Sequence, residues 1–140
     1  MAEGRNLAVR MVSPDGVIWE GPSPFVVLPA LDGEIGIAPG HAPLIVRLGA
    51  GEARIHAGSG VLSFILSGGF LEVLGDRVHV IVDRAETPGT VDVEAAREAL
   101  RALDAPRIRD VDRHEEDLQA RRLAQARLKA AAPKKAPGGY

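Results

Sequence analysis

The stretch GEIGIAPGHAPLI, residues 33–45, is the most informative part of the chain. Apolar and other residues alternate over residues 34–37, which predicts a short β-strand. Pro39 and Gly40 predict a turn, because proline fixes φ and glycine tolerates positive φ. Pro43 keeps the residue before it extended, and an apolar run follows. A loop whose backbone is specified this closely predicts a role beyond linking two strands.

Short runs of alternating or β-branched residues continue on both sides of this stretch, up to Glu86. They recur roughly every ten residues, and turns rich in Gly, Pro, Asp and Ser separate them. The predicted strands are 7–12, 17–19, 25–28, 34–37, 44–46, 52–56, 61–66, 70–74 and 78–82. Short strands at this spacing predict a β-sandwich or barrel. The connections are too short for crossover helices, so we expect antiparallel pairing.

The pattern becomes helical after a linker at residues 87–90. Asp92 is the expected N-cap of a first helix. Its predicted apolar face consists of Val93, Ala96, Leu100 and Leu103. We expect this helix to end at Ala105, because Pro106 follows.

A second helix is predicted to begin at Asp112 and to end within residues 128–132, since Asp112 and Glu115 resemble a capping box. Its apolar stripe is thin and contains Leu118, Leu123 and Leu128 with alanines between them. A stripe of this kind buries little apolar area, and short isolated helices are marginal in water. The two helices should pair as an antiparallel hairpin that detaches at low cost.

These patterns divide the chain into three segments. Residues 1–86 are predicted to form an antiparallel β-sandwich, residues 87–132 a two-helix hairpin, and residues 133–140 a disordered tail. The predicted fold class is therefore α+β.

Composition excludes several classes of protein. The 140 residues are 46% hydrophobic and 26% charged, as in an ordinary globular chain, and aromatic residues are so few that the core must be mainly aliphatic. The net charge of −2 provides no field for nucleic acid, and the absence of cysteine excludes disulfides. We expect no signal peptide and no membrane insertion, because no apolar run reaches the required length.

No catalytic constellation is visible. The four histidines lie at positions 41, 56, 79 and 114, and no two of them have metal-binding helical spacing. The glycine-rich pieces complete neither a dinucleotide-binding nor a Walker pattern, and there is no nucleophile elbow. We therefore assign no catalytic residue, metal site or cofactor, and an enzyme acting alone is disfavoured.

Two motifs resemble a known family. Residues 33–45 are similar to a signature of the epsilon subunit of the F-type rotary ATP synthase, and LSGGFLEV at residues 66–73 is similar to a strand pair of that family. Residues 83–86 lie where the family closes its last strand and enters the helices, and the agreement in order and spacing extends over residues 7–128.

The resemblance implies a fold, a function and partners. The fold would be a flattened sandwich of about ten strands followed by a two-helix hairpin. The chain would be a non-catalytic rotor subunit of the central stalk that couples proton-driven c-ring rotation to ATP synthesis. The sandwich would bind the gamma subunit and the polar loops of the c-ring. The extended hairpin would contact the alpha and beta subunits and inhibit ATP hydrolysis. The subunit would lie peripherally on the cytoplasmic face of a bacterial membrane.

The resemblance also suggests two interface residues. Glu34 matches the acidic position that faces the c-ring in the family, and the alternative is an ordinary exposed strand charge. His41 matches the family histidine near gamma, and the alternative is a turn residue that hydrogen-bonds to the backbone. The neighbouring glycines and prolines are assigned to loop shape.

Some family members bind ATP in the folded hairpin through an acidic residue and an arginine, so a nucleotide-sensing module is the alternative function. The candidates here are Glu94 and Arg97, but Glu98 places a negative charge where the family has alanine. A simple ion pair three residues apart is the other interpretation.

The end of the second helix is basic, with Arg121, Arg122, Arg127 and Lys129. These residues would attract acidic loops of the beta subunits when the hairpin inhibits hydrolysis. The alternative is that they complement the helix dipole, because the acidic residues of this helix lie at its start.

Overall fold

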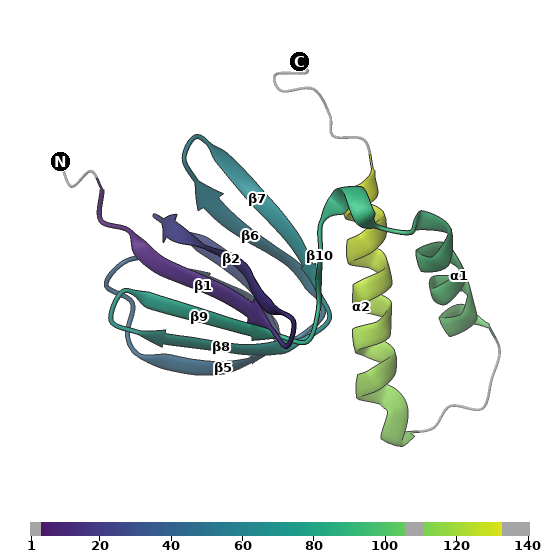
Figure 1. The fold of residues 1–140 in the computed structure, drawn as a ribbon. Coiled ribbons are helices and arrows are strands. Elements are labelled where there is room, and N and C mark those ends of the chain that lie inside the picture. The colour runs from purple at the N-terminus through teal and green to yellow at the C-terminus, as the bar shows by residue number, and fades with distance from the viewer. Residues whose placement is uncertain (1–3, 106–110, 133–140) are drawn as a thin grey trace, which may run out of the picture.

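The computed structural model describes residues 4–105 and 111–132 (Figure 1). The strands are β1 (Leu7–Ser13), β2 (Gly16–Ser23), β3 (Val26–Ala30), β4 (Gly33–Ile37), β5 (Leu44–Leu48), β6 (Gly51–Ala57), β7 (Gly60–Leu66), β8 (Gly69–Leu74), β9 (Arg77–Val82) and β10 (Ala85–Glu86). The helical elements are the 3-10 turns η1 (Pro88–Thr90) and η2 (Val111–Arg113) and the helices α1 (Val93–Asp104) and α2 (His114–Ala131). This order confirms the α+β fold class.

The ten strands form one hydrogen-bonded sheet in the order β10-β7-β6-β3-β5-β8-β9-β1-β2, with β4 paired to β3. The sheet folds over on itself into a sandwich, and the hairpin stands at one end of it (Figure 1). The expectation of purely antiparallel pairing is wrong at one place, because β1 and β9 pair in parallel. These two strands are far apart in the sequence, so the short connections that dictate hairpins do not constrain them.

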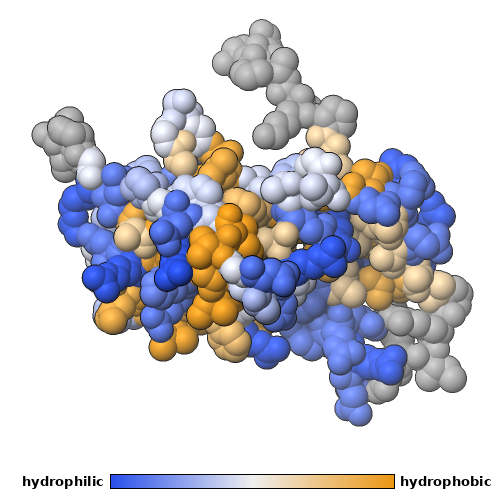
Figure 2. All heavy atoms as spheres, viewed as in Figure 1, coloured by the Kyte–Doolittle hydropathy of each residue, from blue (hydrophilic) through white to orange (hydrophobic). Residues whose placement is uncertain are grey.

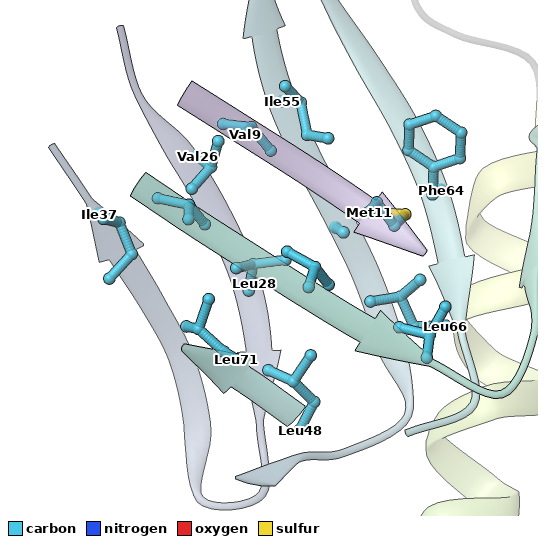
Figure 3. Close-up of a cluster of buried hydrophobic side chains, with 14 of the residues drawn as sticks. Val9, Met11, Val26, Leu28, Ile37, Leu48, Ile55, Phe64, Leu66 and Leu71 are labelled. Atoms are coloured by element: carbon cyan, nitrogen blue, oxygen red, sulfur yellow. The ribbon is translucent and has the colours of Figure 1, made fainter. Parts of the chain in front are cut away.

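The core fills the space between the two layers (Figure 3). Burial alternates along the strands: in β8, Leu71 and Val73 point inward while Phe70 and Glu72 point outward. The core residues are overwhelmingly aliphatic, and Phe64 is the buried aromatic residue among those described. The aliphatic core predicted from the composition is therefore confirmed, and the strands are held by the hydrophobic effect on one face.

Glycines in both motifs allow close approach. A Cβ at Gly69 would lie 2.1 Å from the Ile81 carbonyl oxygen, and the φ angle of Gly69 is +143°. A Cβ at Gly36 would lie 2.8 Å from the ring of Phe25, which rests across this glycine. The motifs therefore need these glycines for packing between strands as well as for turns.

The hairpin confirms the first predicted helix start and corrects the second. Asp92 caps α1, and its carboxylate accepts a hydrogen bond of 3.0 Å from the Ala95 amide. The α-helix α2 begins at His114 with Arg113 as its N-cap, whereas Asp112 lies in η2. A 3-10 turn often precedes an α-helix, and here it displaces the predicted start. The predicted tail at residues 133–140 lies outside the described residues.

Candidate functional surfaces

The two predicted interface residues do not form one site. Glu34 lies at the start of β4, and His41 follows the other end of that strand. Glu34 lines a pocket with Arg122 and Gln125 of α2, whereas Ile37, the last residue of β4, lies away from the helices (Figure 3).

The carboxylate of Glu34 is exposed and paired. Arg54 donates to both of its oxygens, at 2.9 and 3.2 Å, and also donates to Glu52 at 3.2 Å. Ser63 donates to the second oxygen of Glu52 at 2.5 Å. The hydrogen bond to Glu34 raises the pKa of Arg54, although burial works against it. Burial alone would raise the pKa of Glu52, but hydrogen bonds from Ser63 and Arg54 outweigh it and lower that pKa. Two carboxylates therefore share one guanidinium, and Lys129 adds a favourable charge near Glu52.

The loop after β4 is held by contacts to both its backbone and its side chains. His41 donates from its amide to the Ala38 carbonyl at 3.2 Å, and its Nδ1 lies 2.7 Å from the Ala42 carbonyl oxygen. The Gly40 amide donates to Asp76 Oδ1 at 2.9 Å, and Arg5 donates to Asp76 Oδ2 at 2.9 Å. The Gly40 amide and the Arg5 guanidinium lower the pKa of Asp76. His41 therefore makes the backbone hydrogen bonds that its interpretation as a turn residue requires.

Sequence reasoning did not identify an exposed row of apolar side chains on the outer face of the sandwich. Phe70 is opposite Ile81, Ile81 is opposite Val12, and Val12 is opposite Val17, so the row crosses β8, β9, β1 and β2. Phe70, Ile81 and Val17 are 53%, 49% and 51% exposed. We call Phe70, Ile81, Val12 and Val17 the outer apolar row. Figure 2 shows hydrophobic residues reaching the surface of the sandwich between hydrophilic ones.

The strand periodicity contained the signal for this row. In a strand with one face in water, alternate positions are normally polar, yet Phe70 and Ile81 occupy such outward positions. Ile45 on β5 and Leu74 at the end of β8 are also exposed, but on the outer face Glu72 and His79 separate Leu74 from the row, and Ile45 is opposite Glu72. Contiguous exposed apolar area on a small protein indicates a binding surface.

Arginines of α2 engage groups on the rest of the chain in the folded hairpin. Arg122 donates to the Leu31 carbonyl at 2.7 Å, and Arg127 forms a two-pronged ion pair with Glu86. Arg121 pairs with Asp104 of α1 at 2.7 Å. Lys129, the fourth predicted residue, contributes a favourable charge near Glu52. Arg122 and Arg127 therefore hold the hairpin against the rest of the chain, whereas Arg121 joins its two helices.

The seat of α2 lies at the turn between β5 and β6. Gln119 Oε1 accepts a hydrogen bond of 2.6 Å from the Ala50 amide, and a Cβ at Gly49 would lie 2.7 Å from that oxygen. Two apolar side chains outside the core cluster are buried, each 1% exposed: Ile65 of β7, a strand on which α2 packs, and Ala124 of α2 itself. A surface pocket of about 290 Å³ lies beside this seat. It is lined by Glu34, Glu52, Arg122 and Gln125 together with small residues and one proline: Pro29, Ala30, Gly33, Ala50 and Gly51. The apolar contact is small, as the thin stripe predicted, and polar bonds supplement it.

The nucleotide candidates pair with each other. Arg97 donates to Glu94 at 3.0 Å, three residues apart on the exposed side of α1. This geometry agrees with the simple ion-pair interpretation, and ATP binding stays a prediction that the structure does not support.

No metal cluster of three or more histidine, cysteine or acidic side chains occurs within residues 4–105 and 111–132. Among the helices of that part of the chain, none is both long and apolar enough to cross a membrane. The fold and its surfaces define a class of small β-sandwich proteins that carry an exposed apolar row and a docked helical hairpin.

Comparison with known proteins identifies the family. The model of the ATP synthase delta/epsilon chain β-sandwich domain matches residues 6–88. The ATP synthase epsilon chain of Synechococcus elongatus is 39% identical over 131 residues, covering 90% of this chain and 95% of that protein. The ATP synthase epsilon chain of Acaryochloris marina is 40% identical over 126 residues and covers 90% of both chains. The chain belongs to the epsilon-chain family of ATP synthases. It is a non-catalytic stalk subunit.

Solved structures share the fold. A chain of the Euglena gracilis mitochondrial ATP synthase, solved with OSCP, F1 and c-ring, has a TM-score of 0.74 and 22% identity, covering 94% of this chain and 86% of that one. A chain of the Tetrahymena thermophila mitochondrial ATP synthase central stalk and c-ring has a TM-score of 0.69 and 12% identity, covering 94% and 100%. At these identities the likeness establishes the fold.

Proposed function

We propose that this chain is a rotor subunit of the central stalk, peripheral on the cytoplasmic face of a bacterial membrane, that couples proton-driven c-ring rotation to ATP synthesis. Its membership of the epsilon-chain family supports this proposal. The single observation that carries it is the outer apolar row, because a rotor subunit must transmit torque through a firmly attached face.

The gamma subunit is the proposed occupant of the outer apolar row. The row crosses four neighbouring strands, β8, β9, β1 and β2, so one partner surface can cover it. Burial of Phe70 would supply an aromatic anchor at the centre of the interface. Charged side chains in the neighbouring row, including the Arg10–Glu20 pair at 3.1 Å, would form its polar rim.

The polar loops of the c-ring are the proposed partners of Glu34. Its side chain is 56% exposed, so a basic or amide group of the ring can reach it without moving the strand. Arg54 already pairs with this carboxylate, so the ring group would share or displace an existing partner. The net gain in binding free energy would therefore be small. The contact would contribute more to the orientation of the two partners than to their affinity.

The hairpin is proposed to regulate hydrolysis by leaving its seat and contacting the alpha and beta subunits. Its docking rests on a few hydrogen bonds to backbone atoms at Leu31 and Ala50 and on the ion pair with Glu86. Water can replace each of these partners, so the net cost of release is modest. Release would free Arg122 and Arg127 for acidic groups on the catalytic subunits.

Deletion of residues 112–140 tests the regulatory proposal. We expect the truncated chain to assemble into a reconstituted ATP synthase and to raise ATP hydrolysis several-fold, because the inhibitory segment is gone. The assay measures the initial rate of ATP hydrolysis and the stoichiometry of the purified complex. Unchanged hydrolysis in a fully assembled complex would show that the hairpin is not an inhibitor here.

A further inference from the structure

A second row of side chains lies next to the outer apolar row, and each of its four members can carry a charge. Glu72 on β8 is opposite His79 on β9. On the other side of His79 lies Arg10 of β1, which is opposite Glu20 on β2. The four side chains are between 48% and 61% exposed. We call Glu72, His79, Arg10 and Glu20 the charged row.

The charged row contains two ion pairs, and one of them depends on the protonation of a histidine. Arg10 Nε lies 3.1 Å from Glu20 Oε2, and both groups are charged at neutral pH. His79 Nδ1 lies 3.7 Å from Glu72 Oε1, and this ion pair exists only when the imidazole is protonated. The row therefore carries one uncompensated negative charge when His79 is neutral and none when His79 is protonated.

The other groups near His79 do not replace it as the partner of Glu72. Arg77 precedes His79 by two residues on the same face of β9 and is diagonal to Glu72, a separation of about 7–8 Å between Cα atoms. The neighbour of Glu72 on β5 is apolar, namely Ile45. Arg10 faces His79 from β1 and opposes its protonation, but Arg10 is itself ion-paired. Within residues 4–105 and 111–132, His79 forms the one ion pair recorded for Glu72.

A partner that covers the outer apolar row also covers the charged row. The two rows are two residues apart along β8, β9 and β1, which is about 7 Å. A stable interface buries about 800 Å² of each partner, a patch roughly 25–30 Å across. Removal of water strengthens the attraction within an ion pair and raises the cost of an unpaired charge. The protonation state of His79 therefore matters little in the free chain, where the pair is exposed, and more in the complex.

We propose that His79 makes the attachment of this face to gamma dependent on pH, with tighter binding when the imidazole is protonated. The inference rests on the proposed binding of gamma to the outer apolar row. Binding transfers Glu72 into the interface, where a protonated His79 neutralises it. A neutral His79 leaves a carboxylate that has lost water and gained no cation. Formation of the complex therefore takes up a proton from the buffer, and the affinity rises as the pH falls through the range in which histidine titrates.

Titration calorimetry of the full-length chain with purified gamma measures this linkage. Gamma brings its own titrating groups, so each value is the difference between the wild type and His79→Gln. Relative to that variant, the wild type should gain about sixfold in affinity from pH 8 to pH 6 and take up about half a proton more at pH 7, as expected when the complex binds the proton about tenfold more tightly. The proton uptake follows from titrations in phosphate and in Tris, whose heats of ionisation differ.

Further variants show whether the ion pair is the cause. Glu72→Gln should remove the gain in affinity at low pH and should bind more tightly than the wild type at pH 8, because no carboxylate is left to neutralise. His79→Lys should lose the excess pH dependence, since its charge is constant in this range. His114→Gln, at the start of α2, is the matched control and should keep the pH dependence of the wild type. A melting temperature close to that of the wild type verifies that each variant is folded.

The outcomes separate the inference from the function on which it rests. Equal pH dependence of the wild type and His79→Gln would overturn the inference while gamma still binds. A gain at low pH that persists in Glu72→Gln would do the same, because His79 would then respond to a group on gamma. Absence of binding by the wild type at both pH values would contradict the proposed function, and the inference would fail with it.

Discussion

Gly69 has no space for a side chain. The carbonyl oxygen of Ile81 lies 2.1 Å from the position of a Cβ, and the backbone has a positive φ angle. Both constraints act at the first residue of β8, one position before Phe70 of the outer apolar row. The glycine thus fixes how β8 and β9 meet, and with it the spacing of Phe70 and Ile81 across the strands.

Gly69→Ala is predicted to destabilise the chain by about 3 kcal/mol, the sum of overpacking and left-handed backbone strain. The measurement is urea unfolding at pH 7 followed by circular dichroism. The matched control is Gly60→Ala, because a Cβ at Gly60 meets no atom within 4 Å and should change stability little. Equal stability of both variants would contradict the close approach.

Glu52 should make stability depend on pH. Its pKa is lowered in the folded chain, so the carboxylate stabilises the fold at pH values above the ordinary range of an unfolded glutamate. This contribution is lost as the pH falls through the lowered pKa. Glu52→Gln should therefore reduce the free energy of unfolding at pH 7, and the difference from wild type should shrink as the pH falls through the lowered pKa of Glu52. A difference that grows on acidification would have the wrong sign.

The glycines show what a single sequence reveals at this scale. The pattern indicated that Gly36, Gly40 and the SGG pair shape turns, because glycine is the usual residue there. It did not show that the ring of Phe25 covers Gly36, since that contact joins different strands. The hydrogen bond from the Gly40 amide to Asp76 likewise joins segments that are distant in the sequence.

At the scale of elements, α2 combines a weak apolar stripe with specific polar anchors. Ala124 is the buried residue of α2, while Gln119 and Arg122 bind backbone atoms of the sandwich. Such a helix has a defined seat and a modest docking energy, which suits an element that changes position.

Arg122→Ala is predicted to increase opening of α2 by about tenfold, because it removes a charged hydrogen bond to the Leu31 carbonyl. Amide hydrogen exchange measures this opening residue by residue. The strands of the sandwich should retain their protection. Arg121→Ala is the matched control, since Arg121 pairs with Asp104 of α1 and touches no part of the sandwich in any recorded contact. Equal opening in the two variants would show that the hydrogen bond from Arg122 to Leu31 does not hold α2 on the sandwich.

Element by element, local signals predicted most strands and both helices. Period-two alternation located β1, β8 and β9, and the cap at Asp92 located α1. The parallel pairing of β1 with β9 and the seat of α2 at the turn after β5 were not predictable, because both depend on segments far apart in the sequence. The α2 start moved because a 3-10 turn precedes it.

At the scale of the whole molecule, the surfaces lie in different places. The outer apolar row occupies one face of the sandwich, whereas Glu34 and the hairpin seat share a pocket at one end. A rotor subunit needs this separation, because it must hold one partner while touching another. The sequence motifs pointed to partners and to Glu34 and His41, but not to the outer apolar row. Strand periodicity places Phe70 and Ile81 on the outer face, but only the cross-strand pairing shows that they lie side by side.

Titration calorimetry of gamma with the full-length chain tests the central claim most directly. The account predicts a one-to-one complex for the wild type and binding about a hundredfold weaker for Phe70→Ser, as expected for a central aromatic anchor. Val61→Ser, at an exposed apolar position of β7 outside the row, should bind like the wild type. Phe70 is half exposed, so its replacement should leave the melting temperature nearly unchanged. Absence of binding by the wild type, or equal affinity of Phe70→Ser and the wild type, would contradict the claim.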